Sequence, residues 1–431
     1  MVRPEASPED GYLHRRIDEV LDYACTHLPS LDEYAEWWPS REGELVRVQD
    51  KILGETSMLL LIADRAGSGR SSPHWGRLTG LCVRGCRSDR VLCAMARHPR
   101  AVSSLGLGHL FLTGLGNVDA DVDLVVSHAC RTGDVGRQEC VPFRRLEFAW
   151  AWRQASRFSD WTGLSASVRG WAHESSALAW DSVGIYLNRD DCYALTHTLM
   201  YATDFGATGV PGVDVERLRA SVSSSICFAL AIADYDLLGE LLLGDAVLPG
   251  EASPAARCGW AVRTRTLNTL GHLPGPPPCE DEPPEDDPRA RTAYLFWRDY
   301  HPAYVDALLC TSLLGRAEPW FTEPHDTLSA GSVPARIVDT AWPDGDGGPS
   351  GRMARTVEEL EIPAGLRAPV LAEMAAIALV RRYDLIGLRR LLELLEGTPF
   401  KDTGTVESVR RFLTNQFALA ATGRAGQAAG T

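Results

Sequence analysis

Residues 189–206 read RDDCYALTHTLMYATDFG, and this stretch predicts one amphipathic helix. Asp190 and Asp191 fall in its first turn, where the helix dipole favours negative charge, and Gly206 suits a left-handed C-terminal cap. Helical spacing of apolar residues recurs over residues 9–28, 42–65, 74–97, 118–129, 142–158, 170–187, 214–233 and 235–244. Alternating Val, Ile and Thr runs are nearly absent. The sequence therefore predicts an all-α protein.

One face of the 189–206 helix carries the polar side chains of greatest chemical interest. Tyr193, His197, Tyr201 and Asp204 follow one another at spacings of four, four and three residues. A carboxylate that orients an imidazole is a recurring arrangement in acid–base catalysis. We therefore expect His197 to be the catalytic acid or base, supported by Asp204 and Tyr201. We expect Tyr193 to contact the substrate.

The spacing also sets a limit on this predicted group. His197 and Asp204 are about two turns apart, roughly 10 Å by the helix rise, so water or Tyr201 would have to connect them. The alternative is a core histidine bound to a backbone carbonyl, with Asp204 capping the next segment.

Length and composition limit the class of protein. With 431 residues, 45% of them hydrophobic, the chain can bury a large core, as two or three domains or as one helical body. A formal net charge of −14 argues against a nucleic-acid-binding surface. The N-terminus lacks the apolar run of a signal peptide, and no apolar stretch is long enough to span a bilayer. We therefore expect a cytoplasmic protein that binds neither nucleic acid nor membrane.

A short repeated sequence suggests how the helices are arranged. YDLLG at 235–239 matches YDLIG at 383–387, and each follows an apolar helix and precedes a leucine-rich one. Used twice, this unit predicts helical hairpins stacked as an α/α toroid or an α-solenoid. Two amphipathic hairpins that look alike by chance are an equally good explanation.

Breaks in the helical pattern suggest the domain organisation. An acidic, proline-rich loop at 274–290 separates an N-terminal helical region, 1–273, from a C-terminal one, 291–421, unless both belong to one continuous body. Residues 343–351 predict a second flexible loop. We expect the tail, 422–431, to be disordered.

Aromatic residues suggest the wall of a cavity. Five of the twelve tryptophans lie within 31 residues, at positions 150, 152, 161, 171 and 180. Such rings can line a substrate cavity, although they are more often core between helices. The substrate-binding candidates, in addition to Tyr193, are therefore Trp150, Trp152, Trp171, Trp180, His173 and His301.

Two clusters raise the question of a metal. Cys82, Cys86 and Cys93 fall at roughly helical spacing, but they match no familiar zinc pattern, and the eleven scattered cysteines read as free thiols. Asp119, Asp121 and Asp123 begin like a calcium loop but lack its later ligands. They also resemble the acid motif of terpene cyclases that initiate by protonation, although the spacing differs. An acidic first turn of a helix is the alternative, and we assign no metal to the site.

Common enzyme motifs are missing from the sequence. Nucleophilic triads, phosphate-binding loops, dinucleotide fingerprints and HExxH pairs do not occur, and the DFG triplet at 204–206 has none of the other kinase motifs around it. We therefore expect chemistry without a cofactor.

The segment from Thr196 to Gly206, T-H-x-x-x-Y-x-T-D-F-G, resembles a signature of uncharacterised all-helical actinobacterial proteins. Some of these accompany peptide or natural-product biosynthesis, so the resemblance implies a tailoring enzyme of bacterial specialised metabolism. We expect acid–base chemistry (cyclisation, elimination or epimerisation) on a peptide or apolar small molecule. The alternative is a non-catalytic helical-repeat scaffold that holds a peptide or protein partner.

Overall fold

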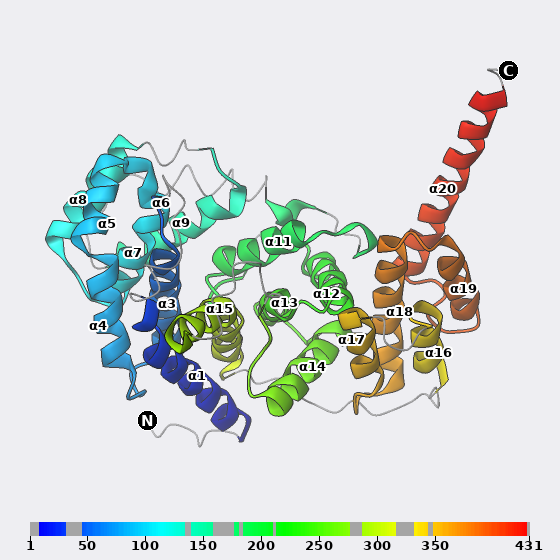
Figure 1. The fold of residues 1–431 in the computed structure, drawn as a ribbon, viewed down its shortest axis with the longest axis horizontal. Coiled ribbons are helices and arrows are strands. Elements are labelled where there is room, and N and C mark those ends of the chain that lie inside the picture. The colour runs from blue at the N-terminus through cyan, green and yellow to red at the C-terminus, as the bar shows by residue number, and fades with distance from the viewer. Residues whose placement is uncertain are drawn as a thin grey trace.

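The structure is a computed structural model that describes residues 8–31, 45–133, 139–157, 176–180, 184–209, 213–275, 287–315, 332–343 and 348–428. Throughout these residues the regular structure is helical and no strand occurs, which confirms the all-α prediction (Figure 1). Trp171 and His173 lie outside the described residues, as does most of the proline-rich segment predicted at 274–290.

The N-terminal part of the chain supplies one lobe, at the left of Figure 1. Within it, α3 packs on α4 and α7, and α7 packs on α9. The sequence predicted one helix over 74–97, but the chain turns at Arg87 and Ser88, so two helices form. The elements are α1 (Pro8–His27), α3 (Val48–Arg65), α4 (Trp75–Cys86), α5 (Asp89–Arg97), η1 (Pro99–Ala101), α6 (Val102–Leu105), α7 (Leu107–Gly114), α8 (Ala120–Thr132) and α9 (Pro142–Ala155).

The middle of the molecule is built around one buried helix, α13 (Tyr235–Ala246). Every residue of α13 from Asp236 to Ala246 is buried. Figure 1 shows this helix at the centre of the green helices. It contacts α11 (Arg189–Ala202), α12 (Val215–Ile232), α14 (Pro254–Leu270) and α15 (Pro288–Leu313). Two short 3₁₀ turns, η3 (Ala177–Ala179) and η4 (Gly184–Tyr186), precede α11. A helix that is buried on all sides should be apolar, so the acidic residues of α13 require an explanation.

The C-terminal helices pack against the middle through α18 (Ala364–Arg381), which contacts α12 and α14. They are completed by α16 (Ser332–Ala341), α17 (Gly348–Glu358), α19 (Leu385–Glu396) and α20 (Gly404–Ala428). Figure 1 shows the end of α20 projecting away from the rest of the molecule. One hydrophobic core cluster runs from Leu13 to Leu413 and includes residues on both sides of the predicted boundary at 274–290.

The repeated sequence at 235–239 and 383–387 does not mark equivalent positions. Ala233 (φ 55°) and Tyr383 (φ 56°) both adopt the left-handed conformation between two helices. The aspartates that follow them directly, Asp234 and Asp384, cap the next helix by accepting a backbone N–H. The two hairpins therefore align two residues away from the sequence match, which had paired Asp236 with Asp384.

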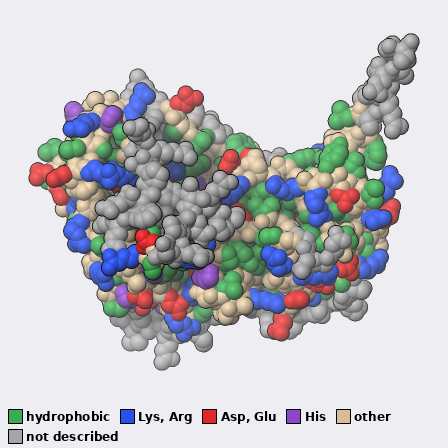
Figure 2. Space-filling view, viewed as in Figure 1, with side chains coloured by type: hydrophobic (Ala, Val, Ile, Leu, Met, Phe, Trp, Pro, Cys, Tyr) green, Lys and Arg blue, Asp and Glu red, His purple; other side chains and the backbone are tan. Residues whose placement is uncertain are grey.

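The surface carries both signs of charge. On the face drawn in Figure 2, described Lys and Arg side chains are interspersed with Asp and Glu. Among the described residues no helix is both long and apolar enough to cross a bilayer.

Candidate active site

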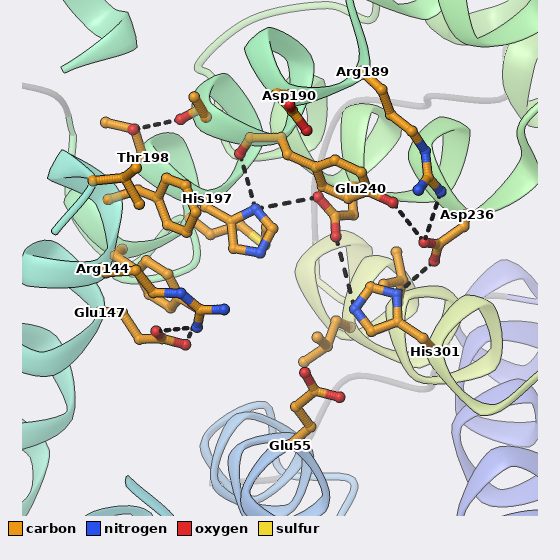
Figure 3. A pocket seen from close by; sticks show the side chains of 18 of the residues that line it. Glu55, Arg144, Glu147, Arg189, Asp190, His197, Thr198, Asp236, Glu240 and His301 are labelled. Carbon is orange, nitrogen blue, oxygen red and sulfur yellow. Dashed lines mark hydrogen bonds and ion pairs between the residues drawn. The ribbon is translucent and has the colours of Figure 1, made fainter. Parts of the chain in front are cut away.

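A pocket of about 750 Å³ lies where the N-terminal and middle helices meet. Its walls come from α3, α9, α11, α13 and α15, together with Ala177 and Trp180. The lining is unusually rich in ionisable side chains, several of which point toward one another in Figure 3. The chemistry of the pocket therefore depends on their protonation states.

His301 of α15 and Asp236 of α13 form a charged pair in this pocket. His301 Nδ1 is 2.5 Å from Asp236 Oδ1, and the Tyr193 hydroxyl donates to Asp236 Oδ2 at 2.7 Å. Burial alone would lower the pKa of His301, but Asp236, with smaller contributions from Glu55 and Glu240, raises that pKa to about 9. Burial alone would raise the pKa of Asp236, but the His301 cation and these hydrogen bonds lower it to about 2. At neutral pH His301 is therefore a cation that can give up a proton.

Glu240 lies one turn after Asp236 on α13 and is 1% exposed. Its Oε2 accepts a hydrogen bond from Thr196 Oγ1 at 2.6 Å, and its Oε1 is 3.8 Å from His301 Nε2. Burial raises the pKa of Glu240 and outweighs the lowering effect of the His301 cation; with a further increase from the charge of Asp236, the pKa is about 8. Glu240 is therefore protonated and neutral at neutral pH, which explains how the buried helix tolerates it.

His197 has the opposite protonation state to His301. Its Nδ1 is 2.8 Å from the backbone carbonyl oxygen of Tyr193, so Nδ1 carries the proton and donates it there. Nε2 makes no hydrogen bond to any described residue, and Figure 3 shows it facing the open part of the pocket. Burial lowers the pKa of His197 to about 4. His197 is therefore a neutral imidazole with a lone pair available in the pocket.

Glu240 lies between these two histidines. Its Oε2 is 3.4 Å from His197 Nδ1, and its other oxygen faces His301. A proton acceptor, His197, and a proton donor, His301, therefore border one cavity, and the neutral carboxyl group of Glu240 lies between them. Pairs of titratable groups whose surroundings push their pKa values apart are typical of acid–base sites.

Tyr201 belongs to a second cluster in the same pocket. Its hydroxyl donates to Glu147 Oε1 at 2.9 Å, and Arg144 Nη1 is 2.6 Å from Glu147 Oε2. The rings of Tyr201 and His197 are 6.2 Å apart between centroids. Burial and then Glu147 raise the pKa of Tyr201 well above its usual value, so the hydroxyl stays protonated. Tyr201 therefore lines the pocket without bonding to His197.

Asp204 does not line the pocket, which differs from the sequence prediction. The helix ends at Ala202, and Asp204, Phe205 and Gly206 then all have positive φ, so the seven-residue spacing from His197 no longer follows a helical face. Asp204 Oδ1 instead accepts from Arg65 Nη1 at 2.6 Å and from Trp150 Nε1.

The other predicted residues divide between pocket, core and turns. Tyr193, Trp180 and His301 line the pocket with His197 and Tyr201, whereas Trp150 and Trp152 are buried outside its lining. Cys82 and Cys86 are buried on α4, but Cys93 is exposed on α5.

The aspartate series at 119–123 opens α8. Asp119 caps this helix by accepting the Val122 N–H, Asp121 is exposed, and Asp123 Oδ1 is 2.8 Å from Nε2 of the buried His109. Throughout the described residues, no group of three or more His, Cys, Asp or Glu side chains is placed to hold a metal ion.

The sequence prediction missed the acids that define the site, Asp236, Glu240 and Glu147. Asp236 and Glu240 are four residues apart within an otherwise leucine-rich segment, and an acid in so apolar a helix is a signal of a buried polar function. Glu147 gives a similar signal within the aromatic segment 142–158.

Together these features define an all-helical protein whose central helices enclose a histidine–carboxylate pocket. Residues 17–311 match the family model described as "Domain of unknown function (DUF6895)". The match spans more than half of the chain, so the protein belongs to this family. All described residues that line the pocket, from Lys51 to Leu308, fall within the matched range. No curated protein and no solved structure gives a significant match.

Glu240→Gln should make protein stability less dependent on pH. Because folding raises the pKa of Glu240, the protonated side chain stabilises the folded state. This contribution to the free energy of unfolding is fully present below the unfolded pKa, about 4.3, and is lost as pH rises through about 8. In the wild type, the free energy of unfolding should fall by on the order of a few kcal/mol between these two pH values. In the variant this fall should be absent, and urea denaturation at a series of pH values would measure both. Glu251→Gln, at a side chain that is 80% exposed, should leave the wild-type slope unchanged. An unchanged slope in Glu240→Gln would show that Glu240 is ionised throughout.

Proposed function

We propose that this protein is an acid–base enzyme that needs no cofactor, with His197 as the base and His301 as the acid. The observation that carries the proposal is that these two histidines border one pocket in opposite protonation states, on either side of the neutral Glu240. Proton transfer by positioned side chains accelerates reactions by about 10²–10⁴-fold per group.

In the proposed reaction, Nε2 of His197 removes a proton from a carbon or heteroatom of the bound substrate. His301 donates its Nε2 proton to the leaving group or to the other face of the substrate, and Asp236 stabilises the cation until that moment. Removal on one side and donation on the other fit an elimination, a cyclisation or an epimerisation. The Arg144–Glu147–Tyr201 cluster would position the substrate from the opposite wall.

The substrate in this proposal is a peptide or a small molecule in bacterial specialised metabolism, as the resemblance of the 196–206 segment implies. A volume of about 750 Å³ falls within the range of about 300–1,000 Å³ that is usual for small-molecule sites. The proposal also includes a cytoplasmic location and a toroidal or solenoidal arrangement of the helical hairpins.

The rate of the proposed reaction should have a bell-shaped pH dependence. Activity should rise as His197 loses its proton, at a pKa of about 4, because only the neutral imidazole accepts a proton. It should fall between about 8 and about 9, as Glu240 and then His301 lose their protons. A pH profile of kcat/KM would check this, and a rising limb near the ordinary histidine pKa of about 6.5 would contradict it.

The first experiment is a search for proton abstraction that does not require the product to be known. Amino acids, amines and short peptides would be incubated with the protein in D₂O and examined by mass spectrometry for deuterium at carbon. Exchange that depends on His197 would support the proposal. A non-catalytic scaffold for a peptide or protein partner, the competing function, would bind without exchange.

A further inference from the structure

Glu55 is a carboxylate of the pocket whose negative charge the protein compensates only weakly. It projects from α3, and Figure 3 shows it pointing into the space between the Arg144–Glu147 pair and His301. Its Oε2 is buried and makes no well-formed hydrogen bond within the described part of the chain. Its Oε1 is 3.7 Å from Nζ of Lys51, whose side chain is 56% exposed. A solvent-exposed ion pair of this kind contributes little to the stability of the carboxylate.

Two other buried acids on these walls already have close partners. Glu147 accepts from both Arg144 and Tyr201, and Asp236 is bound to His301 and to a tyrosine hydroxyl. A buried carboxylate oxygen without a donor costs free energy unless a ligand supplies one. Tyr300 also interacts with Glu55: burial, and then the charge of Glu55 and a hydrogen bond to it, raise the pKa of the Tyr300 hydroxyl well above its usual value. Oε2 of Glu55 still has no donor in good hydrogen-bond geometry among the described residues.

Aromatic rings on α15 line the pocket together with this carboxylate. Trp297, Tyr300 and Tyr304 all contribute to its lining, and the two tyrosine rings meet edge to face with centroids 5.3 Å apart. Aromatic faces attract cations, and a carboxylate beside them adds a charge-assisted hydrogen bond. This combination of groups is suited to an ammonium ion.

We propose that Glu55 and the α15 aromatic rings bind an ammonium group of the ligand, so that the substrate is an amine or a peptide bearing an amine. The ammonium subsite rests on the contacts of Glu55, whereas the reaction of that substrate rests on the proposed function. An amine held at Glu55 extends its remaining atoms toward His301 and His197, which border the same cavity.

The test compares three probes of similar shape: 2-phenylethylammonium, 2-phenylethanol and 3-phenylpropanoate. Their affinities for the full chain would be measured at pH 7 and constant ionic strength by calorimetry or ligand-observed NMR. We expect the ammonium to bind at least about tenfold more tightly than the alcohol, the increment of one hydrogen bond to a charged group, and the carboxylate to bind most weakly.

Two variants assign this preference to Glu55. Glu55→Gln keeps the shape of the side chain and should bring the ammonium-to-alcohol ratio close to one. Asp190→Asn removes the same charge from an exposed residue of the same pocket and should keep the ratio within about twofold of wild type. Lys51→Ala changes a mostly exposed side chain and removes the competing cation, so it should tighten ammonium binding several-fold.

Each outcome decides for or against the subsite. It is rejected if the ammonium does not bind, if its ratio to the alcohol is near one in the wild type, or if the ratio survives in Glu55→Gln. If Glu55→Gln does not fold, the wild-type ratio and Lys51→Ala decide. Ammonium binding without any deuterium exchange would reject only the proposed function, and exchange without a preference for ammonium would reject only the subsite.

Discussion

Replacing His197 with glutamine should reduce turnover by about 10²–10⁴-fold while leaving the fold intact. The substitution removes the basic lone pair of Nε2, which is the proton acceptor on the side of His197 that faces the pocket. The glutamine amide can still donate to the Tyr193 carbonyl in place of Nδ1, so the helix keeps this hydrogen bond. Deuterium exchange or product formation would measure the loss, and circular dichroism would verify the helices.

A matched control is available at His128. This histidine is exposed on α8, outside the pocket lining, and its Nε2 is 3.3 Å from Thr132 Oγ1. His128→Gln should therefore retain full turnover. If His197→Gln also retained it, His197 would be a structural core histidine bound to a backbone carbonyl, and the base would have to be sought elsewhere.

Asp204→Ala should destabilise the protein by on the order of 3 kcal/mol without lowering the activity of the molecules that remain folded. The substitution removes the carboxylate that Arg65 and Trp150 share, and it leaves the Arg65 charge, which is only 23% exposed, without its partner. Alanine is also strained at the positive φ of this position, 52°. Urea denaturation would measure the change.

Asp121→Ala provides the comparison for Asp204. It removes an exposed acid from the first turn of α8 and should change stability by about 0.5 kcal/mol or less. A variant of Asp204 that kept its stability but lost turnover would return Asp204 to the catalytic group that the sequence predicted.

Local sequence rules predicted the part of the site that lies on one helix. Tyr193, His197 and Tyr201 do share a face of α11, and all three line the pocket. The same spacing rule failed at Asp204, because three consecutive left-handed residues end the helix before that face is extended. Two of those residues are not glycine, and although aspartate is enriched at positive φ, phenylalanine is rare there, so the sequence does not predict such a turn.

The remaining half of the site depends on tertiary packing. Asp236 and Glu240 meet His301 only because α13 and α15 pack side by side, some sixty residues apart in the chain. Their protonation states follow from burial, which a single sequence does not give. His301 was a candidate for substrate binding from its sequence context, whereas its charge and its partner could be seen only in the structure.

The origin of the pocket walls has a practical consequence. Because five helices from α3 to α15 contribute to them, the pocket exists only when these helices are packed together, and the unfolded chain has no equivalent site. A ligand that binds only the native state stabilises it through mass action, by about 2.7 kcal/mol at a concentration one hundred times its Kd. Melting-temperature shifts across a library of metabolites can therefore report the natural ligand before its reaction is known.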